Sequence, residues 1–322
     1  MRRWIAVILA VASLLAIVDI VAWQVLTRQM RTAWSSFVAR HRADGWQVAA
    51  GEPVAEGFPL AARLRIADVE ISHDSKPIAA GMSAGAQTLL MELPLLWPTH
   101  IAFIPQGLLH LRLGSGPDID FTAQSLALRG ALGGGAFDLN GAGLQAATLL
   151  GPVVIGTAEA HLALHSRQEP PGGALQLTLK QIGLPQQSRI VALGQSVNML
   201  AFDVTVDAGR MTLQSLNLDW GKLSASGRGS LQTDAQGQPA GDVKLQVFGA
   251  SETLDALTTS GDVAQRDAGN AKMVLGLLQR TGPDGRVFVD LPLKLANRVL
   301  SIGGFPVMRM PELHLPALQS AQ

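Results

Sequence analysis

The stretch "LAARLRIADVEI", Leu60 to Ile71, carries the pattern that decides the fold. Aliphatic residues first take every second position with two arginines between them, as in a strand whose side chains point alternately to opposite faces. The pattern slips at Ala67–Asp68, after which Val69 and Ile71 carry the apolar side chains. A slip with alternation on either side predicts a strand with a bulge or bend at this point.

The same alternation recurs between Gly51 and Ser251, in runs bounded by Gly, Pro, Asn or Asp as in hairpin-connected strands. Examples are Leu109/Leu111/Leu113, Leu175/Leu177/Leu179, Phe202/Val204/Val206, Leu216/Leu218/Trp220 and Val243/Leu245/Val247. One apolar and one wet face per strand is typical of an antiparallel sheet covered on one side. We therefore predict a mainly β fold with a long, curved antiparallel sheet, in which the glycine-rich stretch Arg129–Gly143 is a hairpin.

From Ser251 onward the apolar residues repeat at helical spacing. Acidic residues follow Ser251 within one turn, and the helical pattern stops at Thr281-Gly282-Pro283. We predict a packed helical segment at about 251–281 that covers the apolar face of the sheet. The chain then returns to strands at Val287–Leu291 and Leu295–Ile302.

The N-terminal run "WIAVILAVASLLAIVDIVAW", Trp4–Trp23, follows two arginines and contains one charge, Asp19. At ~1.5 Å per helical residue it is long enough to cross ~30 Å of hydrocarbon. Tryptophan stands at both ends, where interfacial aromatic belts form. A cleaved signal peptide would need a shorter run and a small-x-small site, which Val21–Val25 does not offer. We expect residues 1–23 to be an uncleaved transmembrane anchor.

The helical pattern continues beyond the span, and we assign residues 24–50 to an amphipathic juxtamembrane helix. Its apolar stripe consists of Trp23, Leu26, Met30, Trp34 and Phe37. The arginine-bearing face could lie against anionic lipid heads, or the apolar stripe could dock on the domain that follows. Residues 51–322 are expected to form one large β-rich domain.

Composition excludes several classes of function. The chain has 25 basic and 25 acidic residues and a net charge of zero, without the basic footprint of a nucleic-acid binder. It has no cysteine, which excludes a disulfide framework, a thiolate zinc site and a cysteine nucleophile.

The sharpest enzymatic match is "GMSAG", Gly81–Gly85, which fits the G-x-S-x-G nucleophile elbow with Ser83 as the nucleophile. That motif needs a turn from strand to helix, whereas the residues that follow Ser83 read as a strand. We interpret the match as accidental.

The other candidates are also weak. His161 and His165 alternate with leucines, so on a strand at ~3.3 Å per residue their rings lie ~13 Å apart and cannot share a metal ion. Asp118 and Asp120 could form an acid/base pair or a cation site, but two solvated carboxylates beside a turn are the commoner explanation. The Gly133–Gly135 cluster lacks the context of a dinucleotide fingerprint. We predict no catalytic residues, no cofactor and no metal.

The phrase Gly-Phe-Pro occurs twice, as Gly57, Phe58 and Pro59 and as Gly304, Phe305 and Pro306. Proline lacks an amide hydrogen, so it belongs at the start of a strand or at a sheet edge. We interpret both phrases as structural motifs at strand ends, where phenylalanine seals the apolar layer.

The chain resembles a bacterial family, the domain of unknown function numbered two-one-two-five. The resemblance rests on the N-terminal span, on Gly57–Leu60, on Trp220 and Gly221 with Gly227, Gly229 and Gly241, and on the end "LPLKLANRVLSIGGFPVMRMPEL", Leu291–Leu313. It implies a membrane-anchored envelope protein without assigned activity and carries no catalytic residues. The closing stretch is also similar to the ends of AsmA-like proteins, which implies lipid movement along an open apolar groove.

The arginines after the span outnumber those before it, which favours a cytoplasmic body, but large domains are exported despite such a bias. We expect a single-pass protein of the bacterial inner membrane with its body in the periplasm. The leading hypothesis is a non-enzymatic protein that binds or passes lipid or another apolar ligand. The alternatives are a scaffolding subunit with an envelope protein partner, and a serine hydrolase that uses Ser83.

Overall fold

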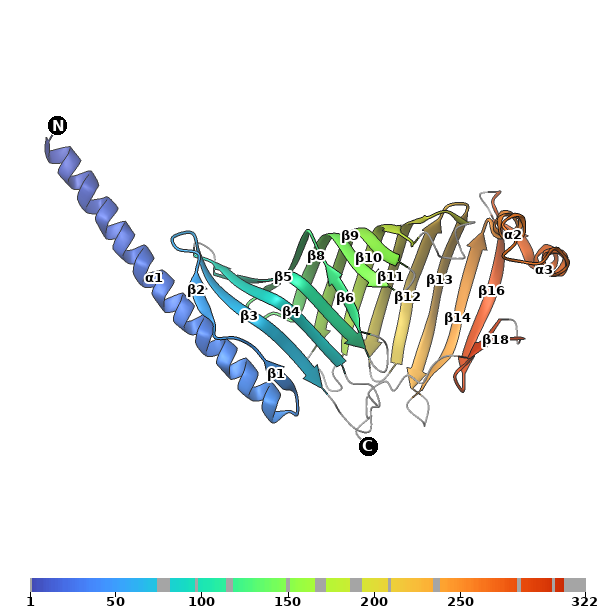
Figure 1. The fold of residues 1–322 in the computed structure, drawn as a ribbon, viewed down its shortest axis with the longest axis horizontal. Coiled ribbons are helices and arrows are strands. Elements are labelled where there is room, and N and C mark those ends of the chain that lie inside the picture. The colour runs from blue at the N-terminus through green and yellow to red at the C-terminus, as the bar shows by residue number, and fades with distance from the viewer. Residues whose placement is uncertain are drawn as a thin grey trace.

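The computed structural model consists of one long helix followed by a single antiparallel sheet that ends near two short helices (Figure 1). It describes residues 2–73, 82–95, 98–113, 118–148, 151–165, 172–185, 193–207, 210–233, 238–282, 285–302 and 305–309, with side chains of the first helix from residue 17 onward. The prediction of a mainly β chain with a long antiparallel sheet is confirmed.

The described residues form three helices and the strands of one 18-stranded sheet. The helices are α1 (Arg2–Ala43), α2 (Ala250–Thr259) and α3 (Gln265–Leu278). The strands are β1 (Gln47–Ala49), β2 (Val54–Glu56), β3 (Ala61–His73), β4 (Met82–Pro94), β5 (His100–Leu113), β6 (Ile119–Thr122), β7 (Ser125–Ala131), β8 (Ala136–Thr148), β9 (Gly151–His165), β10 (Gly172–Gly183), β11 (Ser196–Asp207), β12 (Arg210–Trp220), β13 (Leu223–Thr233), β14 (Pro239–Phe248), β15 (Gln279–Thr281), β16 (Val287–Ala296), β17 (Val299–Ile302) and β18 (Phe305–Arg309).

Most strands pair with their neighbours in sequence, which makes the sheet a meander from β3 to β18 (Figure 1). At three positions in the sheet, two short strands stand where one long strand would otherwise lie. Strands β1 and β2 both pair with β3, and β6 and β7 both lie between β5 and β8. Strands β15 and β17 both pair with β16. The glycine-rich stretch 129–143 forms the hairpin of β7 and β8, as predicted.

The bend predicted in the third strand is present. Asp68 has a φ of 48°, and both Ala67 and Asp68 are exposed between the buried side chains of Ile66 and Val69. The alternation thus resumes one residue later, and the apolar side chains stay on the same side of the strand.

A second interruption of the side-chain alternation crosses three neighbouring strands. Gly143 of β8, Gly156 of β9 and Gln181 of β10 lie level with one another, each between residues that pair regularly. Gly143 has a φ of 58° and Gln181 a φ of 55°. Beyond this line Leu144, Ile155, Ile182 and Val197 continue as one row of cross-strand neighbours. The slips let the sheet curve without turning apolar side chains to the other face.

Helix α1 covers the first part of the sheet. Its buried Met30 and Trp34 pack in one core cluster with Ala62, Leu64 and Ile66 of β3, none of which has any exposed surface. The apolar stripe of the amphipathic segment thus docks on the domain that follows. The helix ends at Ala43, so the segment assigned to residues 24–50 is shorter than expected, and residues 47–49 are strand β1.

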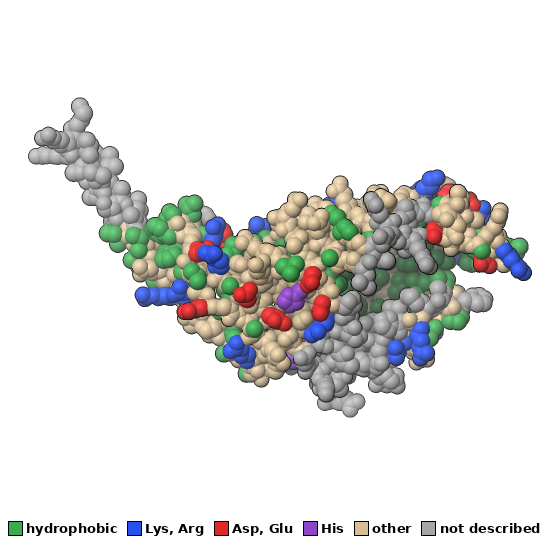
Figure 2. All heavy atoms as spheres, viewed as in Figure 1, with side chains coloured by type: hydrophobic (Ala, Val, Ile, Leu, Met, Phe, Trp, Pro, Cys, Tyr) green, Lys and Arg blue, Asp and Glu red, His purple; other side chains and the backbone are tan. Residues whose placement is uncertain are grey.

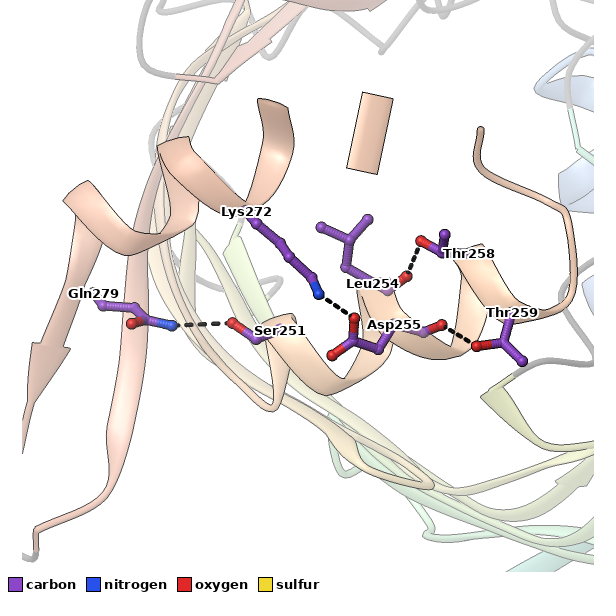
Figure 3. A network of polar contacts seen from close by, with 7 residues as sticks. All are labelled: Ser251, Leu254, Asp255, Thr258, Thr259, Lys272 and Gln279. Atoms are coloured by element: carbon purple, nitrogen blue, oxygen red, sulfur yellow. Dashed lines mark hydrogen bonds and ion pairs between the residues drawn. The ribbon is translucent and has the colours of Figure 1, made fainter. Parts of the chain in front are cut away.

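The C-terminal helical segment differs from the prediction. It is two helices rather than one, because Gly261, with a φ of 82°, ends α2, and residues 279–281 form strand β15. Lys272 of α3 forms an ion pair with Asp255 of α2, and Gln279 donates a hydrogen bond of 3.0 Å to Ser251 (Figure 3). Both helices lie at the far end of the sheet from α1 (Figure 1). The expectation that this segment covers the apolar face is therefore wrong for the first strands, because α1 packs over the apolar side chains of β3.

Helix α1 is continuous from residue 2 to residue 43, without a break at the expected anchor boundary. Among the residues that the structure describes, no helix has the length and apolar character needed to cross a membrane. The side chains of residues 4–16, which form most of the expected span, lie outside the described ones.

The docking of α1 makes a stability prediction. Trp34→Ala should lower the free energy of unfolding by about 3–5 kcal/mol, because it removes a buried indole from the helix–sheet core. The matched change Arg31→Ala, on the exposed side of the same helix, should shift it by less than about 0.5 kcal/mol. Denaturant titrations of the full chain in mild detergent, followed by circular dichroism, measure both; equal losses would contradict the assigned packing.

Candidate functional site

The strand register brings apolar side chains together in rows that cross the whole sheet. The first row runs through Leu64, Met91, Phe103, Leu128, Leu139, Ala160, Leu177, Phe202, Leu216, Gly227, Leu245 and Leu291, each directly opposite the next. Every member is apolar or glycine. With neighbouring strands ~4.8 Å apart, this row extends roughly 50 Å along the sheet.

Two parallel rows flank the first one on the same face. One runs through Leu126, Gly141, Ala158, Leu179, Leu200, Leu218, Ala225, Val247 and Val289. The other runs through Phe137, Leu162, Leu175, Val204, Leu213, Gly229, Val243 and Leu293. We call the surface formed by these three rows the apolar face.

The apolar face is fully covered under α1 and only partly accessible farther along, where Ala158 and Val289 of the second row are also buried. Under α1 the side chain of Leu64 is fully buried. Farther along the same row Leu177, Phe202 and Leu245 are only half-buried, and Leu164, at the edge of the face, is 48% exposed. The first row therefore continues beyond the helix as a partly accessible apolar surface.

The open part of the face is hollowed where its side chains are small. Figure 2 shows hydrophobic side chains inside a hollow that lies over β12 and β13. Here β13 contributes Ala225, Gly227 and Gly229 to the three rows. A Cβ atom on Gly227 would lie 2.3 Å from Cδ2 of Leu245, and one on Gly229 would lie 2.7 Å from Cα of Val243. The two glycines thus let β14 pack closely on β13 at this point of the groove floor.

The opposite face of the sheet is polar. Arg129, Asp138, His161, Gln176 and Asp203 form a row of direct cross-strand neighbours there. Nδ1 of His161 lies 2.7 Å from a carboxylate oxygen of Asp138, and Nε2 of Gln176 donates a hydrogen bond of 3.0 Å to Asp203. These exposed side chains pair with one another across strands, so the polar side chains lie on this face and the apolar rows on the other.

The paired histidines do not meet at a metal site. His161 contacts Asp138 on the polar face, and the side chain of His165 lies outside the described residues. In the part of the chain that the structure describes, no group of three or more His, Asp or Glu side chains could hold a metal ion. Asp118 and Asp120 are both exposed, and Asp118 lies 3.8 Å from Nε of Arg112.

The structure places Ser83 inside strand β4 rather than at a strand-to-helix turn. Its side chain is 4% exposed, and its cross-strand neighbours are Ser72 and Arg112. The strand continues to Pro94, so the described residues do not form a nucleophile elbow; Gly81 lies outside them.

The first Gly-Phe-Pro phrase forms the turn between β2 and β3. Gly57 has a φ of 90°, and the Phe58–Pro59 peptide bond is cis. The ring of Phe58 packs edge-to-face on Trp23 of α1, with centroids 5.9 Å apart, and remains 49% exposed. Phe58 therefore contacts the helix, not the apolar layer of the sheet as expected. This contact could not be read from local sequence, because the two rings are far apart in the chain.

The remaining motif residues also lie at strand ends. Phe305 and Pro306 begin β18, which pairs with β17 at the end of the sheet, and Gly304 lies outside the described residues. Trp220 ends β12, and its indole Nε1 donates a hydrogen bond of 3.0 Å to the carbonyl oxygen of Gly194. Gly221, with a φ of 60°, turns the chain into β13.

Sequence comparison places the chain in a family. The family model DUF2125, described as an uncharacterized protein conserved in bacteria, matches residues 23–311. The chain belongs to this family. No curated protein and no solved structure matches it.

The glycines of the groove floor give a second prediction. Gly229→Ala should destabilise the chain by about 1–3 kcal/mol, because the new Cβ would lie 2.3 Å from the carbonyl oxygen of Asp242. Gly276→Ala in α3, where nothing lies within 4 Å, should instead be neutral or stabilise the chain by up to about 1 kcal/mol. Thermal unfolding of both variants measures the difference, and a neutral Gly229→Ala would count against the close approach of β13 and β14.

Proposed function

We propose that this chain is a non-enzymatic, membrane-anchored protein of the bacterial cell envelope that holds or passes lipid along its apolar face. The observation that carries the proposal is the set of three cross-strand rows made only of apolar residues and glycine. A soluble protein rarely leaves so continuous an apolar surface accessible unless it binds something there.

The energetics of the face suit hydrocarbon chains. Each methylene group removed from water contributes about 0.8 kcal/mol, so an extended acyl chain gains from a long groove without needing polar contacts. Beyond β5 the first row crosses nine more strands, which at ~4.8 Å each offers roughly 40 Å of surface.

The anchor belongs to the same proposal. The run Trp4–Trp23 has the length and the flanking tryptophans of a transmembrane helix, and it continues directly into the part of α1 that packs on β3. We propose that the span lies in the inner membrane and that the body lies in the periplasm. The apolar face then starts beside the membrane.

A scaffolding subunit is the second candidate, and α3 favours it. Met273 and Leu277, one helical turn apart, are 71% and 82% exposed, which is a common arrangement in helices that bind protein partners. A stoichiometric protein partner captured without lipid would support this candidate over the first.

The lipid proposal is tested by placing a charge on the groove floor. Leu216→Asp should lower the lipid retained per protein about tenfold, because a carboxylate against hydrocarbon costs several kcal/mol. The matched control is Asn217→Asp, which puts the same charge on the next residue, on the polar face. Mass spectrometry of lipid bound to the full chain, purified in mild detergent, measures both.

A second variant separates lost binding from lost folding. Ala225→Phe fills the hollow without adding charge and should also reduce retained lipid, while circular dichroism reports whether the sheet persists. Wild-type protein that carries no more lipid than an unrelated single-span protein would overturn the proposal. So would equal lipid retention in the Leu216→Asp and Asn217→Asp variants.

A further inference from the structure

A second apolar surface lies where α1 leaves the sheet, apart from the apolar face. Its helix side consists of Ile17, Val18, Ile20, Val21 and Val25, which are between 42% and 58% exposed. Its other side is the segment before β3, where Val54 and Phe58 are half-exposed and Leu60 is 84% exposed. We call this surface the helix–turn patch. Figure 2 shows hydrophobic side chains gathered at this place.

The turn is held in a fixed position against the helix. The ring of Phe58 packs on Trp23, and Nε1 of Trp23 donates a hydrogen bond of 3.2 Å to the carbonyl oxygen of Glu56. Gly57 permits the tight turn itself, since its φ is 90° and a Cβ there would lie 2.6 Å from the carbonyl oxygen of Ala61. Leu60 is thus presented outward, although the next residue, Ala61, is buried.

Charge distribution identifies what this patch faces. Toward the body, ion pairs join Arg65 to Glu56 and Arg63 to Glu92, and α1 carries exposed arginines from Arg28 onward. Arg28 lies five residues after Trp23, about 7.5 Å along a helix. On the other side α1 continues into the apolar run that begins at Trp4. A step from apolar to charged over such a distance, with a tryptophan at the boundary, is typical of a membrane interface.

We infer that the Phe58–Leu60 turn inserts into the interfacial layer of the same bilayer that α1 enters. The inference rests on the proposed anchor. The patch combines the end of the helical span with a turn from the sheet, and both carry exposed apolar side chains. Figure 1 shows that the turn between β2 and β3 lies beside α1, which projects beyond the sheet. The turn then gives the body a second point of attachment and fixes its tilt against the bilayer.

This attachment places the start of the sheet at the bilayer surface. Strand β3 begins at Ala61, directly after the turn, and its Leu64 opens the first apolar row. Helix α1 buries Leu64 and Met91. A lipid chain that leaves the bilayer beside the turn would therefore pass these covered strands before it meets the open part of the row.

The absence of cysteine from the chain allows a direct test with single-cysteine labels. Leu60→Cys carries an environment-sensitive fluorophore, and the full chain is reconstituted in vesicles of phosphatidylcholine and phosphatidylglycerol. We expect a blue-shifted emission and about twofold quenching by lipid that bears a nitroxide near its headgroup. The matched control is Val287→Cys at the start of β16, at the far end of the sheet from α1, which is 51% exposed and should be neither shifted nor quenched.

A third label, Val18→Cys on α1, separates the two levels of the proposal. Quenching of the Val18 label without quenching of the Leu60 label would overturn the turn inference and leave the anchor in place. Absence of quenching at both positions would overturn the anchor as well. Equal quenching at Leu60 and Val287 would also overturn the inference, since it would reflect general adsorption of the body.

Discussion

The structure depends on one constraint: apolar side chains must stay on a single face while the sheet bends. A regular strand cannot curve sharply without disturbing the order of its side chains. The chain meets this constraint with one residue at each bend that interrupts the alternation of side chains. Such residues are Asp68 in β3 and the line of Gly143, Gly156 and Gln181. Because the extra residues lie level on neighbouring strands, the rows on both sides remain in register.

Helix α1 connects the sheet to the N-terminal apolar run without a joint. A flexible linker would leave the orientation of the body free, whereas a continuous helix transmits the direction of its first turns to the sheet. The contacts of Trp34 and Met30 with β3 fix the other end of this rigid element. The packing of α1 on β3 therefore fixes the position of the apolar face relative to the N-terminal run.

Much of this fold could be predicted because alternation is a local signal. The run Leu60–Ile71 contains its own strand and its own bend, and the glycines at 133–135 lie between two alternating runs. The break between α2 and α3 falls inside the helical segment expected at about 251–281, because Gly261 has a positive φ that ends the first helix.

The arrangement of the candidate site could not be read in the same way. The rows that form the apolar face depend on pairing between residues distant in sequence, such as Leu245 and Leu291, whose register no local pattern reveals. The contact of Phe58 with Trp23 is likewise non-local. A sequence signal was available in the glycines of β13, since Gly227 and Gly229 occupy the apolar positions of an alternating strand.

The meander order has a consequence for how such a protein can change in length. Since most strands pair with the strands before and after them, a hairpin inserted between two existing strands would need no other part of the sheet to rearrange. Each added hairpin would extend the rows by about 9.6 Å, two strand spacings, with both ends of the molecule preserved. Evolution or design can therefore adjust the length of the apolar face in uniform steps, independently of how the protein is attached.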